Sequence, residues 1–226
     1  MKRSVINQLI GDSIEFFNQM NFKLPPWAFF EPNDWLHRIP ECKEIFNNML
    51  GWDLTDFGSG DFHKQGLILF TIRNGNNKID KKPYAEKAMI VEELQETPMH
   101  FHWSKMEDII NRGGGNLVIE LFNSNAKEEF SDRPVEVKID GMLKKIKPGG
   151  KVILTPGESI CLEQGVYHRF YGEPNRGKVL VGEVSAVNDD TSDNRFYHQV
   201  GRFPEILEDE VPLHLLASDY KKYLNL

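Results

Sequence analysis

Residues 66 to 187 form a succession of short runs rich in aliphatic, β-branched and aromatic residues, and this pattern restricts the fold more than any other feature of the chain. Turn-forming pairs separate the runs, and Asn74-Gly75 and Asp140-Gly141 are typical of tight β-turns. Many short strands at regular spacing, without helices between them, indicate an all-β sandwich or barrel. The expected strands are residues 66–73, 86–92, 98–103, 117–123, 135–139, 142–146, 151–154, 159–163, 167–171 and 179–187.

The first sixty residues differ from this region because their apolar residues recur at helical spacing. This periodicity predicts a helix from Ser4 to Met20, with Ser4 as its N-cap. A shorter helix is expected over residues 41–50, with Gly51 at its end. We therefore predict one domain over residues 1–226, made of a helical and irregular wrapper on the outside of the barrel (1–60), the barrel itself (61–200) and a polar C-terminal tail (201–226).

Composition excludes several classes of partner. The chain has 226 residues, enough to bury a substantial core, and its formal net charge of −7 argues against nucleic acid or an anionic membrane as the main partner. Cys42 and Cys161 lie far apart, so a reducing compartment is expected. The N-terminus lacks the continuous apolar segment of a signal peptide, and no stretch has the length of a transmembrane span. These features predict a cytoplasmic protein.

The strongest chemical signal is the stretch HFHWSKMEDIINRGG, residues 100–114. His100 and His102 are two positions apart, so on a β-strand their side chains point to the same face. Glu107 follows at a short distance, and imidazole nitrogens and carboxylate oxygens are the ligands that intermediate divalent metals prefer. Histidine pairs on strands also occur by chance, and three ligands leave a metal site incomplete.

A fourth candidate, His168, lies in LEQGVYHRF, where Gly165 would allow a tight turn into a new strand. The two segments resemble the paired motifs of the cupin superfamily. The first motif is H-x-H, three or four residues, Glu, six residues and Gly, which here is Gly114; the second keeps its glycine and histidine but lacks its proline. The resemblance implies a cupin double-stranded β-helix, or jelly-roll barrel, with one divalent metal per subunit held by His100, His102, Glu107 and His168.

A more particular resemblance covers essentially the whole chain. The chain looks like the D-lyxose isomerases, cupin-type aldose–ketose isomerases, and the likeness is carried by PMHFHWSKMEDIINRGGG, GVYHRFYG, GEVSAVNDDTSDNRF and GRFPEILEDE. It implies interconversion of D-lyxose and D-xylulose, with D-mannose and D-fructose as a secondary pair. It also implies Mn²⁺ as the metal, whereas the ligand set alone admits Co²⁺, Fe²⁺ and Zn²⁺ as well.

An aldose–ketose isomerase must move a proton between C1 and C2, which needs a carboxylate base and groups that stabilise an enediolate oxygen. Glu183 is the candidate base, because its neighbours in VLVGEVSAV are apolar or small and burial would raise its pKa. The alternative is an outward-facing strand residue. Lys87 shares a strand face with Met89 and Val91 and is the second catalytic candidate, with a snorkelling surface lysine as the alternative.

Three further residues are candidates for sugar contacts. Lys105 lies in the loop that joins two of the candidate metal ligands, close to any metal. Asp193 and Arg195 follow the strand of Glu183 and could hydrogen-bond sugar hydroxyls, although a solvated ion pair in a loop is the alternative. The remaining histidines are expected on the surface or in structural positions: His37, His63, His198 and His214.

Two other functions can use the same metal ligands, an Fe²⁺ dioxygenase and a metal- or sugar-binding module without turnover. Dioxygenase pockets for aromatic or thiol substrates favour apolar linings, whereas Lys87, Glu183, Asp193 and Arg195 indicate a polar substrate. A small-molecule sugar is therefore the expected partner. A homodimer is also expected, because the exposed sheet face or edge of such a barrel is commonly covered by a second subunit.

Overall fold

Two antiparallel sheets dominate the structure. It is a computed structural model, and it describes residues 1–189, 192–201 and 204–226. The larger sheet has eight strands in the order β1 (Gly51–Thr55), β2 (Leu67–Arg73), β3 (Tyr84–Val91), β13 (Val179–Ala186), β5 (Glu107–Gly114), β11 (Ser159–Leu162), β8 (Val135–Ile139) and β9 (Met142–Ile146). The smaller sheet has the order β10 (Gly150–Leu154), β6 (Leu117–Ser124), β12 (Val166–Gly172), β4 (Thr97–Phe101) and β14 (Arg195–Phe196), and β7 (Phe130–Ser131) pairs with β6. Two of the stretches that carry the family resemblance include Asp190-Thr191 and Arg202-Phe203, which lie outside the described residues.

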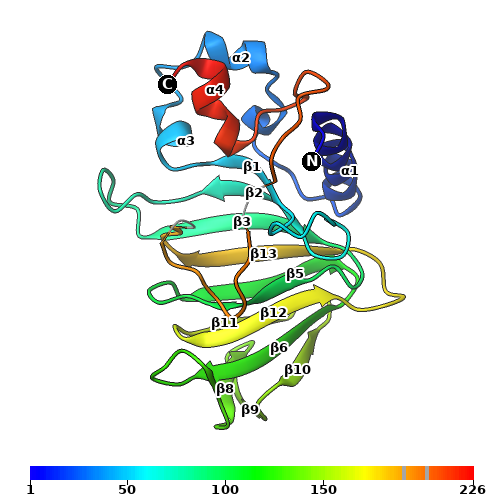
Figure 1. Cartoon of the computed structure of the whole chain (residues 1–226), viewed down its shortest axis with the longest axis vertical. Coiled ribbons are helices and arrows are strands. Elements are labelled where there is room, and N and C mark those ends of the chain that lie inside the picture. Colours follow the sequence, from blue (N-terminus) through cyan, green and yellow to red (C-terminus); the bar gives the residue numbers. More distant parts are fainter. Residues whose placement is uncertain (190–191, 202–203) are drawn as a thin grey trace.

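The two sheets pack face to face around a shared apolar core (Figure 1). Strands of both sheets send buried side chains into it, among them Met89, Val91, Ile109, Ile119, Leu121, Val137, Val152, Ile160, Phe170 and Val181. The result is a cupin-like β-sandwich, so the expected all-β fold is confirmed.

The predicted strands all occur, each within two residues of its expected bounds. Asp140 and Gly141 form the expected hairpin turn between β8 and β9, with φ values of 49° and 77° that suit a type I′ turn. The strands β1 and β5 and the two-residue strands β7 and β14 were not expected. The sequence EDIINRGG of β5 has weak β propensity, but β5 is paired on both sides, with β13 and β11, and this pairing overrides the local preference.

Helices cover the outer face of the larger sheet at the β1 end (Figure 1). α1 (Arg3–Gln19) packs its apolar face on β1, β2 and β3, so the β3 residues Ala88 and Ile90 are buried beneath it while Met89 and Val91 face the inner core. The shorter helices are η1 (Pro26–Phe29), α2 (Pro32–Leu36), α3 (Lys43–Asn47), η2 (Ala217–Asp219) and α4 (Tyr220–Leu224). Among the described helices, none is long and apolar enough to cross a membrane.

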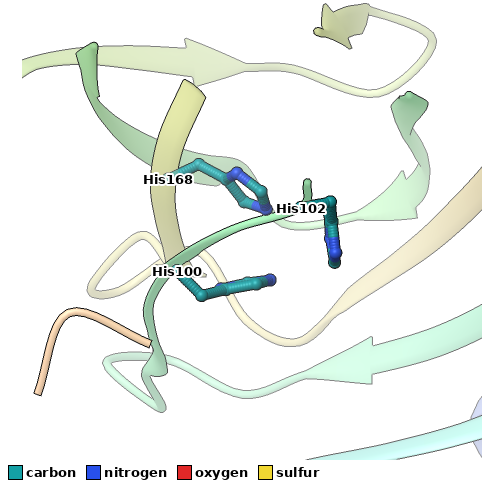
Figure 2. A group of neighbouring side chains, drawn as sticks. All are labelled: His100, His102 and His168. Atoms are coloured by element: carbon teal, nitrogen blue, oxygen red, sulfur yellow. The ribbon is translucent and has the colours of Figure 1, made fainter. Parts of the chain in front are cut away.

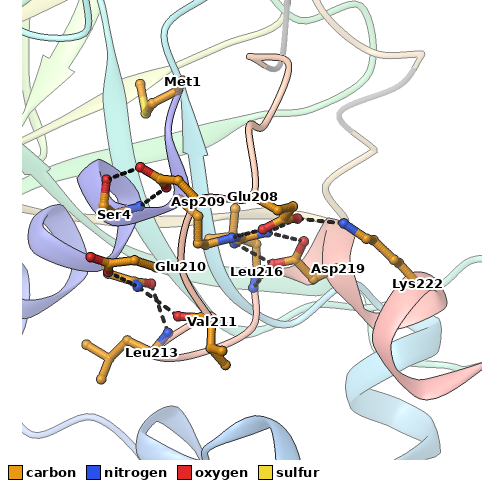
Figure 3. A network of polar contacts seen from close by, with 12 residues as sticks. Met1, Ser4, Glu208, Asp209, Glu210, Val211, Leu213, Leu216, Asp219 and Lys222 are labelled. Carbon is orange, nitrogen blue, oxygen red and sulfur yellow. Dashed lines mark hydrogen bonds and ion pairs between the residues drawn. The ribbon is translucent and has the colours of Figure 1, made fainter.

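The start of α1 corrects the prediction for Ser4, which lies inside the helix, one residue after its first residue, Arg3. Its backbone amide and its hydroxyl both donate to the carboxylate of Asp209, at 2.9 and 2.8 Å (Figure 3). The cap is therefore supplied by a residue far along the chain, which no local pattern could indicate. The helix expected over 41–50 is also shorter, and Gly51, with a φ of 113°, begins β1.

The C-terminal segment is not a polar tail. Leu215, Tyr220 and Leu224 are buried in a separate apolar cluster with Trp35, and Leu216 is buried in the cluster that includes the apolar face of α1. Beside it, the buried guanidinium of Arg3 forms ion pairs with Asp219 and Glu208, the two carboxylates labelled in Figure 3. Since β1 also belongs to the larger sheet, the predicted wrapper and tail both contribute to the packed structure.

Candidate metal and catalytic site

Two neighbouring strands bring three histidines together. His100 on β4 pairs with His168 on β12, and His102 follows directly after β4. One ring nitrogen of each lies within 4.8 Å of those of the other two, and all three residues are buried (Figure 2). The two sequence motifs had predicted that these three histidines lie close together.

Backbone carbonyl groups determine which ring nitrogens face the centre of this cluster. The Nδ1 atoms of His100, His102 and His168 lie 2.7, 2.9 and 3.0 Å from the carbonyl oxygens of Pro98, Asp193 and Val166. Because a carbonyl can only accept, each Nδ1 carries the proton and each Nε2 presents a lone pair. Burial and the two neighbouring imidazoles hold the pKa of His100 well below its usual value, so the ring stays neutral as a metal ligand requires.

Glu107, the first residue of β5, places its carboxylate against two of these rings. Oε1 lies 3.0 Å from His168 Nε2, and Oε2 lies 3.4 Å from His102 Nε2. His168 Nε2 is nevertheless buried without a hydrogen-bond partner among the described residues. With the proton on Nδ1 of the neutral ring, Nε2 is an acceptor that faces a carboxylate oxygen. A divalent cation is what this set of three imidazoles and one carboxylate would satisfy, so these residues fit a metal.

Glycines set the backbone of both motifs. Gly165 has a φ of 73° and turns the chain into β12 as predicted, and its amide donates to the carbonyl of His102 at 3.0 Å. Gly114 has a φ of 87°, and a Cβ atom there would lie 2.3 Å from the carbonyl oxygen of Lys178. The two motifs are therefore joined by a hydrogen bond as well as by strand pairing.

A buried row of alternating charges continues from the histidine cluster. Lys105 Nζ lies 2.6 Å from Glu107 Oε2 and 2.8 Å from Glu183 Oε1, and Lys87 Nζ lies 3.4 Å from the same Glu183 oxygen. Strand pairing explains the last contact, since Glu183 on β13 stands opposite Lys87 on β3. Glu183 also accepts from the hydroxyl of Ser185, and Lys87 donates to the side chain of Asn188 at 2.8 Å. Both catalytic candidates thus face the interior of the sandwich.

The charges change the proton affinities in this row. Burial alone would raise the pKa of Glu183, but Lys105 and Lys87 outweigh it and lower that pKa, so the expected rise is wrong. In the same way Lys105 holds the pKa of Glu107 well below its usual value despite burial. Burial lowers the pKa of Lys87 to about 8, whereas the two carboxylates outweigh burial and raise the pKa of Lys105.

A single cavity borders both the histidine cluster and the charged row. Of the predicted residues it is lined by Lys87, His100, His102, Lys105, Glu107 and Glu183. Sequence reasoning missed Asp53, Thr55, Thr97, Asn194 and Phe196, which also line it. Phe196 stacks on the His100 ring with 5.3 Å between centroids. Asn194 and Phe196 lie within the stretch GEVSAVNDDTSDNRF, which carries the family resemblance, and this was the signal that could have indicated them.

Neither Asp193 nor Arg195 lines the cavity, and both have partners within the protein. Both carboxylate oxygens of Asp193 accept backbone amides, from Ser104 at 2.7 Å and from Lys105 at 2.8 Å. Arg195 pairs with Glu128, with 2.7 Å between Nε and Oε2. Asp193 therefore shapes the loop that carries Lys105, and the guanidinium of Arg195 is engaged at the surface.

The other histidines lie apart from the site. His37, His63 and His198 are exposed, and His63 contacts Glu92 at 2.7 Å. His214 is buried, and its Nδ1 lies 3.0 Å from the carbonyl oxygen of Phe30. These positions agree with the surface and structural roles predicted for them.

Comparison with known proteins identifies the family. A family model described as D-lyxose isomerase matches residues 1–220. The chain belongs to the D-lyxose isomerase family. Two curated relatives support this assignment, the D-lyxose/D-mannose isomerases of Serratia proteamaculans and of Escherichia coli O157:H7. Each is 48% identical to this chain, and the alignment covers 99% of this chain and 100% of the relative. The protein is therefore an enzyme, an aldose–ketose isomerase.

Solved structures share the fold of this D-lyxose isomerase family member at low sequence identity. The ligand-free L-ribose isomerase of Cellulomonas parahominis has a TM-score of 0.61 and 13% identity, covering 92% of this chain and 98% of that one. The L-ribose isomerase of Acinetobacter sp. DL28 in complex with L-ribose has a TM-score of 0.56 and 16% identity, covering 87% and 92%. At this identity the likeness bears on the fold alone.

Proposed function

We propose that this isomerase interconverts D-lyxose with D-xylulose and, as a secondary pair, D-mannose with D-fructose. The names of the two curated relatives support the choice of aldoses. The observation that carries the proposal is the row Lys87–Glu183–Lys105, which opens on the same cavity as the histidine cluster. Proton transfer next to a developing oxyanion needs this combination of one carboxylate and adjacent cations.

We propose one divalent metal per subunit, held by His100, His102, Glu107 and His168, with Mn²⁺ as the native ion. Mixed imidazole and carboxylate ligation suits Mn²⁺, and also Co²⁺, Fe²⁺ and Zn²⁺. When bound, the metal would act as a Lewis acid on the oxygens of C1 and C2 and favour their cis arrangement. The facing acceptors of Glu107 and His168 support this ligand set.

In the proposed reaction from aldose to ketose, Glu183 removes the proton from C2 and returns it to C1 through a cis-enediol, while the hydroxyl proton on the oxygen of C2 moves to the oxygen of C1. Its lowered pKa keeps it ionised at neutral pH, ready to accept a proton. Lys105 holds the carboxylate in place at 2.8 Å and keeps its own charge. Lys87, on the other side of Glu183, donates to a substrate oxygen as negative charge develops there.

The test is a metal-dependent screen of pentoses and hexoses for aldose–ketose conversion. Protein stripped by a chelator should be inactive, and Mn²⁺ should restore conversion of D-lyxose more effectively than that of D-mannose. In deuterated water, conversion through an enediol should place solvent deuterium on C1 or C2. Consumption of O₂ with Fe²⁺ and no sugar conversion would establish the dioxygenase instead, and Mn²⁺ binding without any conversion would establish a binding module.

We also propose a homodimer and a cytoplasmic location. β9 is an edge strand of the larger sheet, and its residues Met142 and Leu143 are 57% and 60% exposed, which supports a covered edge in an assembly. Light scattering after size-exclusion chromatography tests the dimer, since a mass near that of one 226-residue chain would contradict it. Fractionation of cells tests the location.

A further inference from the structure

We propose that the hydroxyl of Thr97 hydrogen-bonds a hydroxyl of the bound sugar, which makes Thr97 a specificity-determining residue. The inference rests on the proposed function, because it needs a polyhydroxylated molecule in the cavity. It concerns a residue outside both metal motifs and outside the charged row.

Thr97 carries a polar atom that the protein leaves unsatisfied. The residue is 4% exposed, and its Oγ1 is buried without a hydrogen-bond partner among the described residues. Buried hydroxyls are nearly always paired, so an unpaired one calls for a physical reason. Here the reason is available, because Thr97 lines the cavity that borders the histidine cluster.

A β-bulge turns Thr97 toward this cavity. Where β4 pairs with β12, His100 lies opposite His168 and Thr97 lies opposite Phe170. These two pairs are three residues apart on β4 but two residues apart on β12, so β4 contains one extra residue. Without the extra residue, Thr97 and His100 would face opposite sides of the sheet, because they are an odd number of positions apart. The bulge contains Pro98, which has no amide to donate to the ladder and whose carbonyl oxygen contacts His100 Nδ1. One irregularity therefore orients both a metal-ligand candidate and Thr97.

Among the described residues, no group pairs with the Thr97 hydroxyl. The cavity that Thr97 lines is also lined by the apolar side chains of Leu67, Met89 and Phe170. A valine would fill the same volume there without a buried polar atom, so packing gives no reason for a threonine. A sugar hydroxyl, which both donates and accepts, is the complementary group.

The position of Thr97 also indicates which part of the sugar it contacts. Lys87 and Glu183 belong to strands of the larger sheet, whereas Thr97 belongs to the smaller sheet and approaches from the other wall. The reacting carbons must lie between the histidine cluster and Glu183. Since Thr97 belongs to neither the histidine cluster nor the charged row, we assign it to a hydroxyl beyond C2, on a part of the sugar that does not change during the reaction.

A matched pair of variants tests this contact: Thr97→Val keeps the shape and removes the hydroxyl, and Thr97→Ser keeps the hydroxyl. We expect Thr97→Val to raise the KM for D-lyxose roughly three- to tenfold and to leave kcat within about twofold, because the contact is equal in ground and transition states. Thr97→Ser should stay within about twofold of the wild type in both constants. The melting temperature of Thr97→Val should be unchanged or higher, since a buried unpaired hydroxyl is lost.

Deoxy sugars separate a direct contact from an effect of packing. Three analogues of D-lyxose are compared, which lack the hydroxyl at C3, C4 or C5. For the analogue that lacks the hydroxyl contacted by Thr97, wild type and Thr97→Val should have the same KM. An unchanged KM for D-lyxose in Thr97→Val would mean that only water meets this hydroxyl and would overturn the inference. A KM penalty of equal size with every analogue would also overturn it.

A binding measurement distinguishes failure of this inference from failure of the proposed function. If the wild type converts no aldose, the proposed function fails, and calorimetry with the unreactive polyol D-arabinitol then tests Thr97 on its own. Weaker D-arabinitol binding by Thr97→Val than by Thr97→Ser would still support the contact, and equal binding would overturn it. Equal Mn²⁺ affinity in both variants is expected, because Thr97 is not a metal ligand.

Discussion

Lys105 Nζ lies 2.8 Å from Glu183 Oε1, and this buried ion pair joins the candidate base to the metal-ligand candidate Glu107, which the same ammonium contacts at 2.6 Å. The contact determines the protonation state of the base. Burial alone would raise the pKa of this carboxylate, whereas the two lysines lower the pKa of Glu183. The site is therefore built to hold an ionised carboxylate out of water.

Glu183→Gln removes the proton acceptor and preserves its size. We expect kcat to fall about 10²- to 10⁴-fold, the range typical of a lost general base, with the metal still bound because Glu183 is not a ligand. The measurement is turnover of D-lyxose at saturating Mn²⁺, with metal content determined on the same sample. Glu136→Gln, an exposed strand residue, is the matched control and should keep full activity. Full turnover by metal-loaded Glu183→Gln would exclude Glu183 from the mechanism.

Lys87 predicts a decline of activity at alkaline pH. Burial lowers its pKa from 10.5 to about 8, so it loses its charge as the pH rises through about 8, and kcat/KM should fall there. Lys87→Arg keeps its charge throughout and should move this decline to higher pH, whatever its activity at neutral pH. The free energy of unfolding should instead rise between pH 8 and 10.5, because there the unfolded chain binds the extra proton. Identical normalised pH profiles for wild type and Lys87→Arg would contradict the assignment.

Asp193 predicts an effect on metal binding without contact with the metal. Asp193→Asn sets an amide NH₂ group against the backbone amide of Ser104 or Lys105. This repulsion disturbs the backbone at position 193, whose carbonyl oxygen orients the His102 ring. We expect Mn²⁺ affinity to fall roughly 10- to 100-fold, as for other groups that orient a ligating histidine. Titration calorimetry measures this, and Asp132→Asn at an exposed turn is the control. A lowered kcat at saturating Mn²⁺ with unchanged metal affinity would argue for a sugar contact instead.

The sequence indicated the histidine cluster because its information is local. His100 and His102 are two positions apart at the end of β4, and Gly165 marks the turn that leads to His168. The alternation of Lys87 with Met89 and Val91 placed that lysine on the inner face in the same way. Such patterns need only the strand period and one family motif.

What the sequence did not indicate depends on contacts between distant segments. The lowered pKa of Glu183 comes from lysines on β3 and on the loop before β5, so burial alone gave the wrong direction. Thr97 faces the cavity only because of a β-bulge, and strict alternation would place it on the other face. The roles of Asp193 and Asp209 depend on backbone amides that lie about ninety or more residues earlier in the chain.

The ion pairs of Arg3 predict that the two ends of the chain hold each other in place. The Arg3 side chain is 0% exposed, and it pairs with Asp219 at 2.9 Å and with Glu208 at 2.8 Å. Arg3→Met should lower the free energy of unfolding by about 3–5 kcal/mol, because it leaves the buried carboxylate of Asp219 without its cation. Lys222→Met removes only an exposed partner of Glu208 and should cost at most about 1 kcal/mol.

Acid denaturation tests the same contact with a defined sign. The hydrogen bond from Arg3 lowers the pKa of Glu208 from 4.5 to about 2, so the stabilisation is present above pH 4.5 and is lost as the pH falls toward 2. In Arg3→Met this part of the pH dependence should disappear, whereas Lys222→Met should largely keep it. The double variant Arg3→Met/Asp219→Asn should recover part of the stability lost in Arg3→Met, because no unpaired charge remains buried. A double variant that is less stable than Arg3→Met would show instead that Asp219 acts chiefly through the amide of Leu216, from which it accepts at 3.0 Å.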